Sequence, residues 1–146
     1  MFSPDFREFV ALLNKHEVKY MIVGGYAVGI HGHPRYTGDL DIWLLPEPEN
    51  ATNILIVIKA FGFGSLDIKV ADLTKENSVI QLGYPPLRID LLTSIDGVHF
   101  NECYPNRKTI EIDRLSVNFI GYTDLLKNKK ASGRHQDLGD IENLEK

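Results

Sequence analysis

The chain has little of what marks secreted or membrane-embedded proteins. It contains one cysteine, Cys103, in 146 residues, so neither an internal disulfide nor a zinc cluster built on cysteines is available. Its longest apolar runs, 20–23 and 54–58, are far shorter than the ~18–20 residues that a membrane span needs. The first residues lack the basic and apolar regions of an export signal. We therefore expect a cytoplasmic protein that does not enter a membrane.

Positive charge is also scarce. The 16 Lys and Arg residues stand against 20 Asp and Glu residues, a formal net charge of −4. Binding along duplex DNA needs many phosphate-neutralising cations, so this balance argues against it, although a nucleotide bound through a metal ion is still compatible. Both the Gly-x-Gly-x-x-Gly fingerprint and the P-loop are absent. The remaining composition, 43% hydrophobic and 25% charged, is that of a globular protein of one domain, residues 1–146.

Hydrophobic periodicity predicts an α+β domain, with a core of about residues 4–120 and a helical segment over about 121–146. Ser3 and Pro4 suit the N-cap and the first position of the first helix. We expect helices over 4–16, 26–31, 47–60, 122–130 and 134–145. We expect strands over 18–23, 39–45, 78–82, 87–92, 109–113 and 116–120.

Two aspartates two residues apart, Asp39 and Asp41, head the second expected strand. Side chains at this spacing point to the same face of a strand, so both carboxylates emerge together while Leu40 and Ile42 turn to the core. A divalent cation would turn the repulsion between the carboxylates into attraction, and Mg²⁺ prefers such oxygen ligands. The alternative is a pair of solvated acids at a strand end.

A third carboxylate, Asp90, lies in the expected strand 87–92 between two apolar neighbours. If this strand lies beside the one that carries Asp39 and Asp41, all three carboxylates share a face. Such a set can hold two metal ions ~3.5–4 Å apart, the arrangement that serves phosphoryl transfer. The alternative for Asp90 is a salt bridge to Arg88 or Arg35.

Gly24 and Gly25 lie between an expected strand and an expected helix, shortly before the acidic pair. Glycines there let the backbone approach a phosphate closely, although an ordinary strand-to-helix turn has the same composition. Arg35 and Thr37 precede the acidic pair in an expected loop, where Arg35 could clamp a phosphate or neutralise the acids. His31 and His33 are interpreted as loop residues, because no partners complete a zinc site near them.

Residues 127–134 carry four cations and no acid. This segment favours a local positive patch suited to a triphosphate or an RNA backbone, or else a solvated helix face that complements the helix dipole. Asp137 and Asp140 follow three residues apart, which is typical of a helix near its start.

Taken together, these residues resemble the polymerase-beta-type nucleotidyltransferase superfamily. The resemblance rests on Gly24-Gly25, on the stretch 35–42, on Asp90 and on the segment Asp124–Ile141, and it covers about residues 18–144. The segment at 124–141 is similar to the abortive-infection, toxin-type (AbiEii-like) branch. Two positions depart from the family pattern: Gly25 stands where many members have serine, and Gly38 where relatives often have a polar residue.

The resemblance implies a small mixed or antiparallel sheet with helices packed against it and a short helical tail. It implies that Asp39, Asp41 and Asp90 bind two Mg²⁺ ions, or Mn²⁺, and that Asp90 serves the attacking hydroxyl as base. Nucleotide contacts are expected from the glycines, from Arg35 and Thr37, and from the tail positions Lys129, Arg134 and Asp137.

The implied activity is transfer of a nucleoside monophosphate from an NTP to a hydroxyl, with release of pyrophosphate. The acceptor could be an RNA end, a protein side chain or a small molecule, and the branch suggests a toxin with an antitoxin partner. The alternative is a catalytically silent module that senses nucleotides or binds a partner on the same fold.

Overall fold

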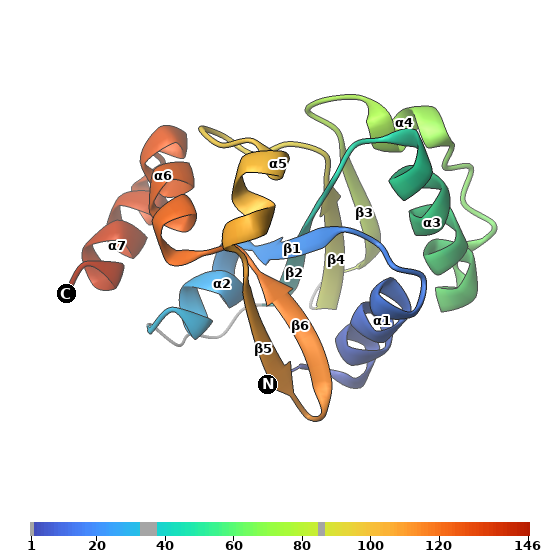
Figure 1. The fold of residues 1–146 in the computed structure, drawn as a ribbon, viewed down its shortest axis with the longest axis horizontal. Helices are drawn as coiled ribbons and strands as arrows, with labels where there is room; N and C mark the ends of the chain where they lie inside the picture. Colours follow the sequence, from blue (N-terminus) through green and yellow to red (C-terminus); the bar gives the residue numbers. More distant parts are fainter. Residues whose placement is uncertain (1, 33–37, 85–86) are drawn as a thin grey trace.

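A computed structural model describes residues 2–32, 38–84 and 87–146. One mixed sheet runs through the molecule, and helices lie around it (Figure 1). The helices are α1 (Pro4–Lys15), α2 (Gly24–Ile30), α3 (Pro48–Ile58), α4 (Val70–Thr74), α5 (Phe100–Cys103), α6 (Tyr122–Ser132) and α7 (His135–Leu144), with a π turn at Lys59–Phe63 and a 3₁₀ turn at Tyr104–Asn106. The strands are β1 (Tyr20–Val23), β2 (Asp39–Leu44), β3 (Val79–Tyr84), β4 (Leu87–Leu92), β5 (Lys108–Ile112) and β6 (Leu115–Phe119).

The strand order is β3-β4-β2-β1-β6-β5, so β2 and β4 are central neighbours although they are far apart in sequence. They pair in parallel, as do β1 and β6, while the other neighbours are antiparallel. The expected α+β class and mixed sheet are confirmed. The expected strands are all found: the strand over 87–92 has the expected bounds, and the ends of the others are shifted by one or two residues.

One face of the sheet carries the hydrophobic core. Leu40, Ile42 and Leu44 of β2 are fully buried on this face, as the alternation of the strand predicts. The buried stripes of α1 and α3 complete the core, and Phe9 of α1 packs edge to face on Phe61, with ring centroids 5.1 Å apart. At the start of α1, the Phe6 amide donates to the Ser3 hydroxyl at 3.2 Å, which confirms the predicted cap.

The opposite face is divided between packing and polar side chains. Trp43 of β2 is buried here against Phe100 of α5, with ring centroids 5.2 Å apart. Asp39 and Asp41 lie on the same face, nearer the start of β2, and remain partly exposed. Because α5 covers only the Trp43 end, the two acids stay accessible.

Two short helices, α4 and α5, lie in stretches for which the sequence predicts no element. The helix expected over 26–31 begins earlier, at Gly24, so the two glycines form its first turn. None of the helices in the described part of the chain has the length and apolar character needed to cross a bilayer.

Candidate active site

The parallel pairing of β2 and β4 brings three aspartates together. Asp39 is the register partner of Arg88, and Asp41 is the register partner of Asp90. Register partners on adjacent strands share a face of the sheet with Cβ atoms ~5 Å apart. The condition under which Asp90 joins the acidic pair is therefore met.

Arg88 lies among these carboxylates. Its Nε donates to Asp90 Oδ1 at 2.8 Å and its Nη2 donates to Asp90 Oδ2 at 3.0 Å, a bidentate pair. The same Nη2 donates to Asp39 Oδ2 at 3.2 Å. The salt bridge to Arg88 that the sequence offered as an alternative for Asp90 is thus present, and it exists alongside the acidic cluster.

Asp41 is the more buried of the two acids of β2. Burial, together with the neighbouring Asp90 and Asp39, raises the pKa of Asp41 to about 7, against the opposing influence of Lys129 and Arg88. Close carboxylates thus repel one another here, and a divalent cation among them would relieve that repulsion.

The backbone of β1 and Gly24 contacts Asp41 on the side opposite β4. β1 pairs antiparallel with β2, so that Val23 is the register partner of Asp41. The next residue, Gly24, has φ +68° and lies so close that a Cβ there would overlap Asp41 Oδ2. Glycine is required at this position because both the conformation and the contact exclude a side chain.

A cleft of about 420 Å³ opens beside Asp41, between the sheet and the end of α6. One wall comes from the sheet and the loop that follows β4, and the other from the end of α6 and from Arg134. Its lining residues are Val23, Gly24, Asp41, Val79, Leu92, Ser94, Ile95, Asp96, Asn128, Lys129, Ser132 and Arg134. The cleft is large enough for a nucleotide-sized ligand or part of one.

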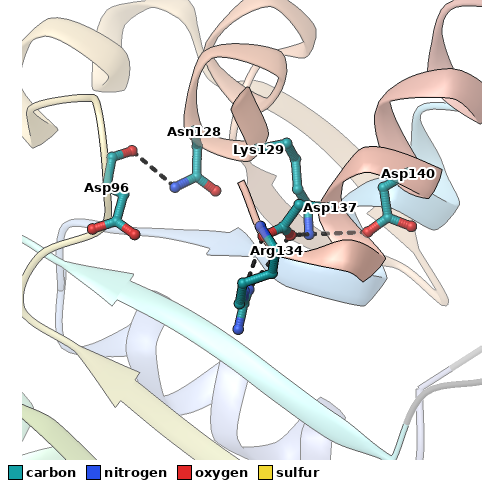
Figure 2. A network of polar contacts seen from close by, with 6 residues as sticks. All are labelled: Asp96, Asn128, Lys129, Arg134, Asp137 and Asp140. Carbon is teal, nitrogen blue, oxygen red and sulfur yellow. Dashed lines mark hydrogen bonds and ion pairs between the residues drawn. The ribbon is translucent and has the colours of Figure 1, made fainter. Parts of the chain in front are cut away.

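The α6–α7 wall is held by a network of ion pairs (Figure 2). The Lys129 ammonium is buried and contacts Asp137 Oδ1 and Asp140 Oδ2, both at 3.1 Å. Asp137 also accepts from Arg134 Nε at 2.9 Å and from the Arg134 backbone amide at 3.2 Å. The Asn128 amide donates to the Asp96 carbonyl at 2.9 Å and ties the loop after β4 to α6.

This network changes the interpretation of the cationic segment 127–134. Burial alone would raise the pKa of Asp137, but hydrogen bonds from Arg134, Ser132 and Lys129 outweigh it and hold the pKa well below its ordinary value. Lys130 is exposed and pairs with Glu145 at 3.5 Å. The acids of α7 and Glu145 therefore neutralise part of the patch, while Arg134 keeps an exposed side chain at the cleft.

The predicted site residues thus fall into three groups. Asp39, Asp41, Asp90 and Gly24 meet at the cluster, with Gly25 next in the first turn of α2. Lys129 and Arg134 line the cleft, and the buried Asp137 holds them both. Arg35, Thr37 and His33 lie outside the described residues. His31 shares a hydrogen bond of 2.7 Å with the Ile120 carbonyl, a structural contact in keeping with its interpretation as a loop residue.

Sequence reasoning missed the remaining polar groups of the cleft. Ser94 and Asp96 lie in the loop that follows β4, the strand of Asp90, and the course of this loop brings them to the cleft. Asn128 and Ser132 precede and follow Lys129 on α6, and only the packing of α6 shows that they face the cleft. Asp140 was assigned a helix-start role, whereas it is buried against Lys129.

The chemistry of the donor set suits a divalent cation, because three carboxylates lie on one face and Lys129 and Arg88 offset their repulsion at Asp41 only in part. As they stand, however, no three His, Cys, Asp or Glu side chains among residues 2–32, 38–84 and 87–146 converge closely enough to hold a metal ion. Two of the three aspartates are instead bonded to Arg88.

No protein-family model matches the sequence, and no curated protein matches it. Several solved structures share the fold. A nucleotidyltransferase-like antigenic protein from Paracoccidioides brasiliensis is 18% identical, with a TM-score of 0.56 over 98% of this chain and 77% of that one. The lincosamide antibiotic adenylyltransferase LnuA, solved with lincomycin, is 12% identical, with a TM-score of 0.59 over 99% of this chain and 97% of its own.

A third neighbour, ANT(2″)-Ia in complex with adenylyl-2″-tobramycin, is 10% identical, with a TM-score of 0.58 over 95% of this chain and 84% of that one. At these identities the likeness shows the fold. The chain therefore has the fold of nucleotidyltransferases, as the resemblance of its motifs implied.

Proposed function

We propose that the protein is a metal-dependent nucleotidyltransferase that moves a nucleoside monophosphate from an NTP to a hydroxyl group. The observation that carries the proposal is the register of β2 and β4, which sets Asp41 beside Asp90 on the fold of nucleotidyltransferases. Asp39 and Asp41 would hold Mg²⁺ or Mn²⁺, with Asp90 as a further ligand. The metal supplies charge neutralisation at the transferred phosphoryl group.

The chain's own residues have distinct parts in this reaction. Gly24 packs directly against Asp41, and the backbone of Gly24 and Gly25 at the start of α2 would approach the phosphates. Arg134 would contact the triphosphate from the α6–α7 wall. The acceptor oxygen bonds to the α-phosphorus, the bond from that phosphorus to pyrophosphate breaks, and the hydroxyl proton passes to an Asp90 carboxylate oxygen. Lys129 is held by two carboxylates, so its part is to keep the cleft wall in place and to favour ionised Asp41.

A small molecule is the first acceptor class to examine. The solved complexes of two neighbours contain lincomycin and adenylyl-2″-tobramycin, both small molecules, and the cleft of this chain is itself of small-molecule size. RNA ends and protein side chains are the other acceptor classes.

The test is transfer of label from α-labelled NTPs, with Mg²⁺ or Mn²⁺, to small-molecule, RNA and protein fractions. Asp41→Ala and Asp90→Asn should abolish transfer while the purified variants stay folded by circular dichroism. Asp67→Asn is the matched control, because Asp67 is exposed and does not line the cleft. Absence of labelled product in all three fractions would refute the proposed function.

A silent nucleotide-binding module is the second candidate, and the salt bridges of Arg88 to Asp39 and Asp90 favour it. This module would bind NTPs and release them unchanged. Calorimetric binding of a non-hydrolysable NTP, together with no transfer, would support the module over the enzyme.

The toxin role is a proposal that rests on the similarity of residues 124–141 to the abortive-infection branch. Induced expression should then arrest growth of a bacterial host, and Asp41→Ala should relieve the arrest at equal protein level. Growth unaffected by the unmodified chain would contradict a toxin role without contradicting nucleotidyl transfer.

A further inference from the structure

The guanidinium of Arg88 uses the same oxygens that a metal ion between β2 and β4 would need. It engages both oxygens of Asp90, at 2.8 and 3.0 Å, and Oδ2 of Asp39 at 3.2 Å. Charge-assisted bidentate pairs of this kind are the strong class of hydrogen bonds. A divalent cation placed between the two carboxylates would lie next to the guanidinium charge, and like charges repel at such distances.

The surroundings give this side chain room to leave. The register partner of Arg88 on β3 is Gly83, which has no side chain to confine the guanidinium. The partner of Asp90 on β3 is Gln81, whose exposed amide offers an oxygen that can accept from a displaced guanidinium. The Arg88 side chain is itself about one-quarter exposed, so it borders open solvent.

We propose that Arg88 is the internal counter-ion of the metal-free cluster and a positioning residue that the divalent cation displaces. In the metal-free protein it neutralises Asp39 and Asp90 and keeps them together. On metal binding the guanidinium swings toward β3, which opens the acidic cluster. The inference rests on the proposed function of this site. It adds that a side chain of the protein itself, Arg88, competes with the metal for the carboxylates.

Mn²⁺ binding, measured by electron paramagnetic resonance and calorimetry at pH 8, tests the proposal on the full chain. Arg88→Gln should bind Mn²⁺ at least about tenfold more tightly, because the charged hydrogen bonds no longer compete. Arg88→Lys keeps the charge but loses the bidentate hydrogen-bonding geometry, so its Mn²⁺ affinity should lie between those of the unmodified chain and Arg88→Gln. Arg7→Gln is the control of equal charge, since Arg7 bonds the Asp113 carbonyl on another part of the chain.

A merely structural arginine gives a different pattern. Its loss would lower the melting temperature equally with and without Mn²⁺ and leave the affinity unchanged. The proposal instead requires that Arg88→Gln lower the melting temperature of the metal-free protein. It also requires that Mn²⁺ raise the melting temperature of Arg88→Gln by more than it raises that of the unmodified chain. Equal or weaker Mn²⁺ binding by Arg88→Gln overturns the proposal, as does a lack of Mn²⁺ binding by every variant.

Arginine side-chain NMR provides a second readout, which is measured on the unmodified chain. In ¹⁵N-labelled protein the Arg88 Nε–H signal, assigned by its loss in Arg88→Lys, should shift and exchange faster as Mg²⁺ saturates the site. An unchanged signal at saturation overturns the proposal. Metal binding that displaces Arg88 without any transfer of nucleotide would leave this inference standing and refute the proposed function.

Discussion

Gly24 lies directly against the carboxylate of Asp41. A side chain at Gly24 would meet Oδ2 of Asp41 and come within 3.1 Å of its Cγ, and the backbone there has φ +68°. The contact follows from the register of β1 and β2, because Val23 is the partner of Asp41 and the chain turns into α2 at the next residue. The glycine therefore sets the position of a metal-binding candidate as well as the turn.

Gly24→Ala should lower stability by about 2–4 kcal/mol, since a strained backbone conformation and an overlap with Asp41 act together. It should also weaken Mn²⁺ binding, because Asp41 has to move. Gly133→Ala is a close control: the φ of Gly133 is +63°, but a Cβ there would lie at an ordinary 3.8 Å from the Lys130 carbonyl oxygen, so the substitution should cost only about 1 kcal/mol. Equal losses in urea unfolding would show that strain alone matters.

Asp41→Asn should make the metal-free fold more stable at pH 8 than the unmodified chain. Asp41 has a pKa of about 7 in the fold and an ordinary value of 3.8, so the folded state holds its proton more tightly. The Asp41 carboxyl therefore contributes its full stabilisation of the fold, on the order of a few kcal/mol, below pH 3.8, and this contribution is lost as the pH rises to about 7. Urea unfolding in EDTA from pH 4 to 8 measures the difference between the two proteins; parallel curves would contradict the prediction.

Lys129→Met should destabilise the fold by about 3–5 kcal/mol, because Asp137 and Asp140 lose their shared buried cation. Lys130→Met is the neighbouring control. Its pair with Glu145 is exposed on both sides, so its loss should cost about 0–1 kcal/mol. Adding Asp140→Asn to Lys129→Met should restore part of the stability, and thermal unfolding of the three variants checks the order.

Arg134→Gln should weaken NTP binding about tenfold, because a charge-assisted contact to the triphosphate is lost. Lys127→Gln removes the same charge from the same segment, but Lys127 does not line the cleft. It should change NTP affinity by less than about twofold at 0.15 M salt, where exposed charges are screened. Equal effects of the two substitutions in calorimetry would indicate a general electrostatic attraction in place of a direct contact.

The acidic cluster could be predicted from sequence because it depends on local rules. The two-residue spacing of Asp39 and Asp41 sets their common face, and the apolar neighbours of Asp90 mark its strand. Only the pairing of β2 with β4 was needed to join them, and the family resemblance supplied that. Arg88 was visible as a salt-bridge alternative, but its simultaneous contact with both strands depends on register.

The cleft wall could not be predicted in the same way. Residues 127–134 look like a cationic surface when they are taken as a linear segment. Gly133 adopts a left-handed conformation that turns the chain back, and α7 then places Asp137 and Asp140 against Lys129. The helices α4 and α5 were missed because four or five residues are too few to show a helical period.

The parallel pairing of β2 and β4 also has a consequence for the order of folding. Asp39 and Arg88 are 49 residues apart along the chain, so closing that loop costs entropy before their contact stabilises anything. Non-local parallel pairings of this kind form slowly. A growing chain thus exposes Asp39 and Asp41 well before Asp90 is synthesised, and the repelling carboxylates first meet when their own arginine arrives on the same strand.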